Sequence, residues 1–472
     1  MVETAARSIR TRLLGSWKAL AVATLAFSLV ATGQAQAAGL IRDAETEKLI
    51  RDYAKPIFKA AGLGSQGIEI HIVNDRAFNA FVVDGHNMFI HAGTLMMADT
   101  PNQVIGVIAH ESGHITGGHL ARLRTQVSRA KSAALMLQLL GLAAMAAGAV
   151  AGDGNIGQAG AGIAFGGTEA AMRSVLAYRQ DEESSADQAA VTFLNASHQS
   201  GKGMLQSFEK LATKLIGIEG INPFLQSHPL PTQRLSQLRA LVSSSPYYNV
   251  KDPPELQFRH DLVRAKLVGF LDKPEVVFNK YPESDRSYPS YYARAIATYR
   301  DKGVDAAMPL LDALTESQPD WPYFHEIKGQ FLFESGRAKE AIPSLKRAVE
   351  LSPDEPLIRV MLAQAQLGDP TPQNVDDAIT NLQFALARER TSAMGYRQIA
   401  IAYGRKADKL SGQARITYLA KADLASAEAY FYEGQIGLAK QQAKRAQHGF
   451  VEGTPNWIQA DDILRFEVPQ TN

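Results

Sequence analysis

A histidine pair at helical spacing is the feature of this sequence that points most directly to chemistry. Residues 110–114 read His-Glu-Ser-Gly-His, and residues four apart on a helix lie on one face, about one turn from each other. His110 and His114 can therefore direct two imidazoles at one metal ion, while Glu111 is placed to take a proton from a water molecule there. This arrangement is typical of zinc-dependent peptide hydrolysis. The alternative, a pair of hydrogen-bonded core histidines, leaves the glutamate unexplained.

The segment that carries the motif is predicted to be a buried helix. Thr100 is a suitable N-cap, and Pro101 fits the first helical position, where its missing N–H costs nothing. Apolar residues then recur at helical spacing, at Val104, Val107 and Ile108. Imidazoles on so apolar an element would be costly without a partner, and a bound metal ion would supply one.

A third ligand is needed, and the sequence offers one candidate nearby and one far along the chain. His119 lies one residue short of the position that a third histidine ligand would need, so we interpret it as structural or as a partner of a ligand. Glu183 and Asp187 share one face of a second predicted helix with small and apolar residues. A glutamate from that helix would complete a site that leaves one position for water. The neighbouring Asp181 and Glu182 are interpreted as a solvated acidic face.

These elements, taken in chain order, resemble the HtpX/CAAX-prenyl-protease type of zinc metallopeptidase. The resemblance is carried by the histidine pair with its glutamate, by Glu-Ser-Ser-Ala-Asp at 183–187, and by His-Pro-Leu-Pro-Thr-Gln-Arg at 228–234. It implies one zinc ion per chain, held by His110, His114 and Glu183.

The same resemblance implies roles for residues around the metal. Glu111 is the general base, Asp187 orients a ligand histidine, and Arg234 pairs with active-site carboxylates. His228 lies near the metal, where it either stabilises the oxyanion or gates the site by filling the open coordination position of a latent enzyme. The arginine that the family carries before the ligand glutamate is displaced by one position at Arg179, so it receives no role.

The N-terminus has the pattern of an export signal. Basic residues precede an uncharged apolar run from Ala19 to Thr32, and Ala35-Gln36-Ala37 follows as a cleavage site. We therefore expect residues 1–37 to be a signal peptide, cleaved after Ala37, and the mature protein to lie in the periplasm. The absence of cysteine excludes disulfides and thiolate zinc sites. Near-equal numbers of basic (49) and acidic (48) residues, with no basic run, argue against nucleic acid as a partner.

A long apolar stretch follows the histidine motif. Residues 132–152 carry no charge, whereas 154–168 are glycine-rich. Length alone would allow the first run to cross a membrane, but a single crossing would separate Glu183 from the histidine pair. We therefore predict a helical hairpin over about 130–175 with a glycine-rich tip. Packing over the peptidase core is the favoured interpretation, and contact with a membrane or an unfolded client is the alternative.

Alternating sequences before the motif predict a small antiparallel sheet. A strand is expected at 68–73, and a hairpin at 79–91 turns at Asp84-Gly85. Such a sheet beside the histidine helix would offer an edge strand. An extended substrate can add to that edge through backbone hydrogen bonds, which suits a peptidase of low sequence specificity.

The C-terminal half repeats with a period of 34 residues. Ala307 recurs as Ala341 and Leu311 as Leu345, which is the spacing of tetratricopeptide repeats. Stacked helix pairs of this kind form an extended concave surface that suits docking of another protein.

The predicted fold is an α+β zincin-type metalloprotease domain at 38–245, mostly helical with the small antiparallel sheet. A linker at 246–256 leads to an all-α tetratricopeptide-repeat solenoid at 257–472. This order resembles the periplasmic β-barrel assembly-enhancing proteases of the BepA type. The resemblance implies an endopeptidase that degrades misfolded or misassembled outer-membrane proteins, with the repeats docking the client or the barrel-assembly machinery. The competing hypothesis is a non-proteolytic chaperone or scaffold for outer-membrane protein assembly, in which a ligand or the base should be missing.

Overall fold

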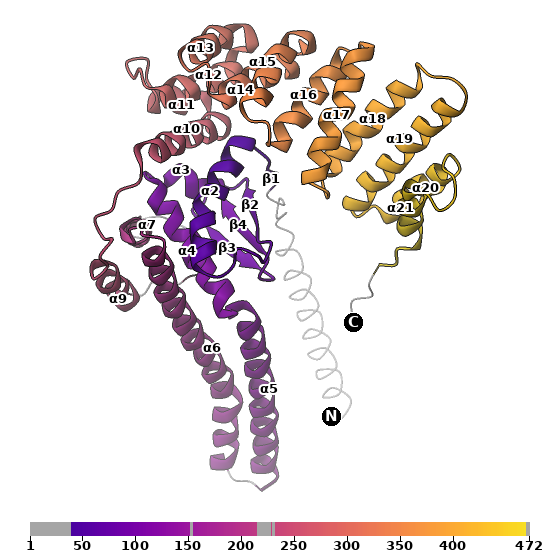
Figure 1. Cartoon of the computed structure of the whole chain (residues 1–472). Coiled ribbons are helices and arrows are strands. Elements are labelled where there is room, and N and C mark those ends of the chain that lie inside the picture. The colour runs from indigo at the N-terminus through magenta and orange to yellow at the C-terminus, as the bar shows by residue number, and fades with distance from the viewer. Residues whose placement is uncertain (1–38, 152–153, 215–227, 229–231, 469–472) are drawn as a thin grey trace, which may run out of the picture.

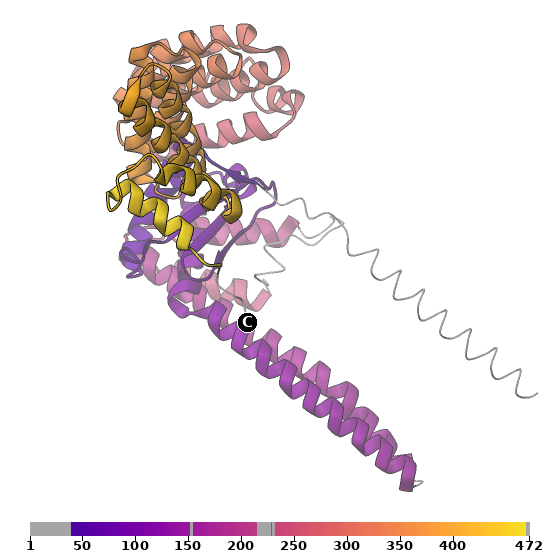
Figure 2. The same cartoon turned by 90° about the vertical axis from the view of Figure 1, so that its right-hand side faces the viewer.

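The molecule has three parts: an N-terminal α/β body, a long helical hairpin that leaves it, and an arc of helix pairs (Figures 1 and 2). The structure is a computed structural model that describes residues 39–151, 154–214, 228 and 232–468. A mostly helical body with a small sheet, followed by an all-helical array, confirms the predicted fold class. The elements of the body are β1 (Leu40–Ile41), α2 (Ala44–Ala60), β2 (Glu69–Val73), β3 (Ala80–Val83), β4 (Asn87–His91), α3 (Ala92–Met97), α4 (Pro101–Gly117), α7 (Lys202–Lys214) and α9 (Thr232–Ser243).

The sheet is mixed, so the prediction of an antiparallel sheet is wrong. Its order is β1-β2-β4-β3, in which β2 and β4 are parallel while the two outer pairs are antiparallel. The predicted hairpin is confirmed, and Asp84 and Gly85 at its turn have φ of 55° and 81°, as a tight hairpin turn requires. The chain passes from β2 to the far edge before it returns as β4. Alternation defines each strand but not the neighbour with which it pairs.

Helix α4 carries the histidine pair through the centre of the body. It begins at Pro101 after Thr100, as predicted, although the Thr100 side chain makes no capping hydrogen bond. Every residue from Pro101 to Gly113 is buried. A Cβ atom at Gly113 would lie 2.8 Å from the carbonyl oxygen of Ala186, so glycine allows this helix to approach the next ligand-bearing helix closely. The helix ends at Gly118, whose φ of 62° forms a left-handed C-cap.

The predicted helical hairpin is present, but it does not pack over the body. It consists of α5 (His119–Ala151) and α6 (Gly154–Ala196), which run side by side away from the body for most of their length (Figures 1 and 2). The favoured interpretation of core packing is therefore wrong, because the left-handed cap at Gly118 starts α5 on a path that leaves the core. In the part of the chain that the structure describes, no helix combines the length and the apolar character needed to cross a membrane.

The C-terminal part is an arc of antiparallel helix pairs (Figure 1). Ala307, Leu311, Ala341 and Leu345 are fully buried at equivalent places, so the 34-residue spacing marks equivalent packing positions. Helix α10 begins inside the stretch predicted as a linker. The helices are α10 (Pro254–Leu271), α11 (Pro274–Lys280), α12 (Tyr288–Lys302), α13 (Val304–Ser317), α14 (Pro322–Glu334), α15 (Ala338–Leu351), α16 (Pro356–Gly368), α17 (Pro372–Arg388), α18 (Ala393–Ala407), α19 (Gly412–Tyr432), α20 (Ile436–Gln447) and α21 (Pro455–Arg465).

A buried ionic cluster joins the body to the arc. The Lys266 ammonium of α10 contacts Asp43 and lies 3.5 Å from Glu45 and 3.6 Å from Glu326. Glu45 also accepts a hydrogen bond of 3.0 Å from the Tyr292 hydroxyl. The start of the body and the first repeat helices thus share one set of buried charges, which fixes the arc against the sheet.

Candidate active site

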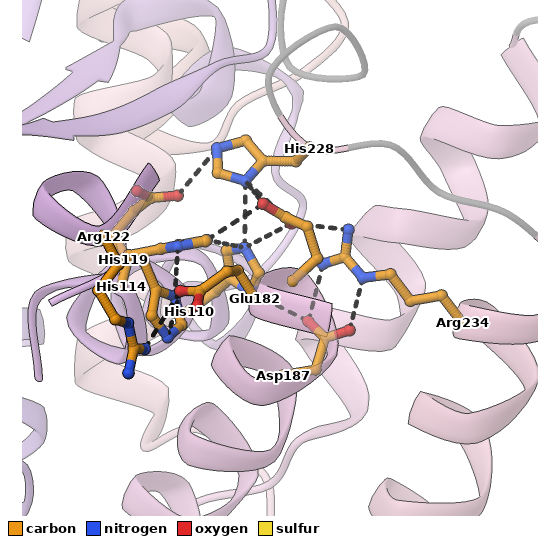
Figure 3. Close-up of polar contacts among 10 residues, drawn as sticks. His110, His114, His119, Arg122, Glu182, Asp187, His228 and Arg234 are labelled. Atoms are coloured by element: carbon orange, nitrogen blue, oxygen red, sulfur yellow. Dashed lines mark hydrogen bonds and ion pairs between the residues drawn. The ribbon is translucent and has the colours of Figure 1, made fainter. Parts of the chain in front are cut away.

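Four side chains of metal-binding type converge in the body (Figure 3). Ligand atoms of His110, His114, Glu183 and His228 all lie within 4.8 Å of one another, and all four residues are in a buried cluster. The Nε2 atoms of the histidine pair are 3.1 Å apart, and each lies 3.4 Å from a carboxylate oxygen of Glu183. The structure therefore brings together the residues that the sequence nominated from α4, from α6 and from the segment before α9. Imidazole and carboxylate donors in this number are a set that zinc commonly uses.

Asp187 and Arg234 hold two members of this cluster in place (Figure 3). The Arg234 guanidinium donates to both carboxylate oxygens of Asp187, at 2.7 and 2.9 Å, and its Nη1 lies 2.8 Å from Glu183. Asp187 in turn lies 3.0 Å from Nδ1 of His110. Since Nδ1 faces this carboxylate, Nε2 of His110 is directed at the centre of the cluster.

Glu111 supplies an independent test of whether the cluster fits a metal ion. Both of its carboxylate oxygens are buried and have no hydrogen-bond partner among the described residues. One of them lies 3.6 Å from Nε2 of His228. Buried carboxylates are normally hydrogen-bonded, so two orphaned oxygens beside convergent imidazoles indicate a place for a polar guest. A metal ion with a water molecule satisfies both groups, and the residues present therefore fit zinc.

The electrostatics of the cluster favour positive charge at its centre. Burial opposes the charged form of His110, yet Asp187 and Glu183 raise its pKa to about 9. Burial likewise opposes the charged form of Glu183, but His228 and His110 lower its pKa overall. Burial and the neighbouring His110 lower the pKa of His114, and burial raises the pKa of Glu111. A proton and a metal ion therefore compete for the same place.

Glu182 has a position that the sequence did not reveal. Its interpretation as a solvated residue is wrong, because only 13% of the side chain is exposed. Its carboxylate lies 3.0 Å from Nε2 of His119 and accepts a hydrogen bond of 3.3 Å from Arg122, while Nδ1 of His119 lies 2.9 Å from Nδ1 of His114. Gly117 leaves room for the His119 ring, since a Cβ there would lie 2.1 Å from it. The missed signal is charge complementarity between the two arms of the hairpin.

A cavity of about 170 Å³ opens beside the cluster. Edge strand β3 contributes Phe81 and Val82 to its wall, opposite Glu111 and His114. The predicted edge strand therefore borders the histidine motif. The other lining residues are His119, Leu120, Leu123, Arg179, Glu182, Glu183 and His228.

The sequence of the body matches a known peptidase profile. Residues 41–242 match peptidase family M48. They form a domain of that family. With this domain and its convergent histidines and glutamates, the chain is a metalloendopeptidase.

Two curated proteins resemble this chain well beyond the peptidase domain, and a third resembles it over about the length of that domain. The beta-barrel assembly-enhancing protease of Yersinia pestis is 24% identical over 359 residues, which cover 73% of this chain and 71% of that protein. The protein of that name from Escherichia coli K12 is 24% identical over 360 residues, or 74% and 70% of the two chains. Metalloprotease LoiP of Escherichia coli K12 is 28% identical over 204 residues, which cover 41% of this chain and 72% of that protein.

Proposed function

We propose that this protein is a zinc-dependent endopeptidase of the periplasm that degrades misfolded or misassembled outer-membrane proteins. The convergence of His110, His114 and Glu183 beside the orphaned oxygens of Glu111 carries the proposal. Similarity to beta-barrel assembly-enhancing proteases supports the class of substrate. The export signal predicted at residues 1–37, with cleavage expected after Ala37, supports the compartment and lies outside the described residues.

We infer a task in peptide hydrolysis for each of these residues. His110, His114 and Glu183 would hold one zinc ion per chain. When bound, the ion activates a water molecule and polarises the scissile carbonyl. Glu111 accepts a proton from the attacking water on a carboxylate oxygen and passes it to the leaving amine. Asp187 keeps the proton of His110 on Nδ1, so that the Nε2 lone pair faces the centre.

His228 is placed to gate this chemistry. Its Nδ1 lies 3.0 Å from Glu183 and 3.3 Å from Nε2 of His110, and its Nε2 lies 3.6 Å from Glu111. In this position the ring is in contact with His110, Glu183 and Glu111, and it would stand in the way of a substrate carbonyl. A shift of the ring away from Glu111 would admit the carbonyl and leave an imidazole N–H able to stabilise the oxyanion.

Substrate binding has two supports in the fold. An extended client strand would pair with the backbone of edge strand β3 at the cavity beside Glu111, which gives affinity with little sequence preference. The repeat arc would dock the client or the barrel-assembly machinery on its concave surface. The ionic cluster of Lys266 would keep this docking surface in a fixed place relative to the peptidase domain.

Digestion of an unfolded outer-membrane porin tests the proposal. Wild type should cleave it, a zinc chelator should stop cleavage, and Glu111→Gln should lower the rate by about 10²–10⁴-fold with zinc retained. Glu69→Gln, a carboxylate change at an exposed position of β2, is the matched control and should cleave normally. Turnover by Glu111→Gln at the wild-type rate would contradict the mechanism. Binding of the porin without cleavage by wild type would favour the chaperone or scaffold hypothesis instead.

A further inference from the structure

The hairpin exposes a group of large apolar side chains that the proposed peptidase function does not use. Leu135, Met136, Leu139 and Leu140 are 58%, 68%, 59% and 60% exposed, and Leu142 is 51% exposed. All five lie within about two turns of α5, so they form one continuous surface, which we call the apolar patch. Apolar surfaces of this kind on soluble proteins mark places of interaction.

A basic band borders the apolar patch on the side of the body. Helix α5 contains four basic residues and no acidic residue. Arg124, Arg129 and Lys131 are exposed, whereas Arg122 is bound to Glu182. Apolar side chains next to exposed cations match the layers of a membrane surface, where acyl chains lie beneath anionic headgroups.

The direction of the hairpin leaves this surface accessible. Figure 2 shows α5 and α6 pointing away from both the body and the repeat arc. A flat lipid surface could therefore meet the hairpin without contact with the other two parts. A second copy of the chain fits less well, because it would bring two basic bands together. An unfolded client gives no reason for the basic band.

We propose that the apolar patch docks on an anionic lipid surface, with Arg129 and Lys131 at the level of the headgroups. This inference goes beyond the proposed peptidase activity and does not depend on the metal. It gives the hairpin the task of holding the peptidase domain beside a membrane.

Vesicle flotation of the purified mature chain, residues 38–472, tests the proposal. Wild type should float with vesicles of phosphatidylcholine and phosphatidylglycerol and bind pure phosphatidylcholine more weakly. Leu139→Glu/Leu140→Glu should abolish flotation, and Arg129→Gln/Lys131→Gln should weaken it by roughly 25-fold at low salt, about fivefold for each charge. High salt should reduce this second effect because it screens the attraction.

Matched control variants in the repeat arc distinguish docking through the apolar patch from nonspecific adsorption to vesicles. Leu438→Glu/Ile458→Glu changes two exposed apolar residues, and Lys440→Gln/Lys444→Gln removes two basic ones. Both should float like wild type. Flotation of Leu139→Glu/Leu140→Glu at the wild-type level would overturn the proposal. The proposal would also be overturned if Leu139→Glu/Leu140→Glu lost only self-association, or only binding of unfolded casein. The apolar patch would then serve a second copy of the chain or a client.

A different observation carries a second inference, about the ligand His114. Nδ1 of His114 faces Nδ1 of His119 at 2.9 Å, and Nε2 of His119 faces the Glu182 carboxylate at 3.0 Å. His119 is 4% exposed, and Gly117 leaves room for its ring. We infer that Glu182 and His119 are positioning residues that fix the ring and tautomer of His114, so that its Nε2 lone pair faces the centre.

Zinc affinity, measured by competition with a chromophoric chelator, tests this inference, which rests on the proposed metal site. His119→Ala should weaken binding by about 10–100-fold, and His119→Gln, which retains a hydrogen-bonding group, should restore part of the loss. Glu182→Ala should weaken zinc binding when made in wild type but should cause no further loss when combined with His119→Ala, because Glu182 acts through His119. Arg122→Ala removes another partner of Glu182 and is the control.

The outcomes separate the two ideas. A wild type that binds no zinc would overturn the proposed metal site itself. Zinc binding by wild type that His119→Ala leaves unchanged, or additive losses in the double variant, would overturn only the positioning role.

Discussion

Two buried clusters of charged residues in this protein are balanced in opposite ways. At the junction with the repeat arc, the Lys266 ammonium stands among Asp43, Glu45 and Glu326, so the chain supplies the central cation itself. In the M48 domain, imidazoles and the Glu183 carboxylate converge instead on a common centre. The first cluster already contains its cation and links the body to the repeat arc. We propose that the second receives a cation from outside, and this difference separates a structural cluster from a functional one.

Removal of Lys266 should have the largest effect on stability. Lys266→Met would leave three carboxylates, two of them buried, without their cation and should destabilise the fold by roughly 5 kcal/mol, the upper end for a broken buried ion pair. Lys328→Met, which breaks a partly exposed pair with Asp312, is the matched control and should cost less than about 1 kcal/mol. Denaturant unfolding measures both. Equal losses of unfolding free energy in the two variants would show that the Lys266 cluster does not stabilise the junction.

Zinc should stabilise the protein through the other cluster. At a free concentration of about 1,000 times its dissociation constant, zinc should raise the free energy of unfolding by about 4 kcal/mol. Glu183→Gln should lose most of this gain, whereas Lys266→Met should keep it, because the two clusters share no residue. Thermal or denaturant unfolding with and without zinc distinguishes these cases. A gain of equal size in Glu183→Gln would place the metal elsewhere.

Acid should weaken the junction through a neutral histidine. His260 is buried between the Tyr53 hydroxyl and the carbonyl oxygen of Ala98, at 3.0 Å from each, and burial lowers its pKa to about 4. In the unfolded chain this histidine binds a proton near pH 6.5. The contribution of neutral His260 to the free energy of unfolding is therefore complete above pH 6.5 and is lost as the pH falls towards 4. The total loss is about 3 kcal/mol.

Unfolding at pH 7 and pH 4.5 measures this effect against a background of other titrating groups. His260→Gln should lose less stability between the two pH values than wild type does. His325→Gln, at a partly exposed site in the repeat arc, should follow wild type. Parallel profiles for wild type and His260→Gln would exclude His260 as the source.

Local patterns predicted the parts of the fold that depend on local spacing. The helix of the histidine pair and the hairpin turn at Asp84-Gly85 follow from neighbours along the chain, and the structure confirms both elements. The 34-residue period likewise marked buried positions such as Leu311 and Leu345. Their prediction required no knowledge of distant contacts.

Features that depend on distant contacts could not be predicted in this way. The parallel pairing of β2 with β4 depends on where the chain crosses the sheet, which alternation does not encode. Glu182 lies in an acidic run that is typical of a solvated helix face, and only the fold brings His119 and Arg122 against it. The exposure of Leu139 depends on the direction in which α5 leaves Gly118. Glu183 was nominated by resemblance, and the structure places it with the histidine pair.

The zinc content of the purified chain after equilibrium dialysis tests the central claim most directly. We predict one zinc ion per chain for wild type and for Glu111→Gln, strongly reduced zinc for Glu183→Gln, and porin cleavage by wild type alone. Absence of zinc from wild type, or full zinc occupancy in Glu183→Gln, would contradict the claim that the histidine pair and Glu183 form the metal centre.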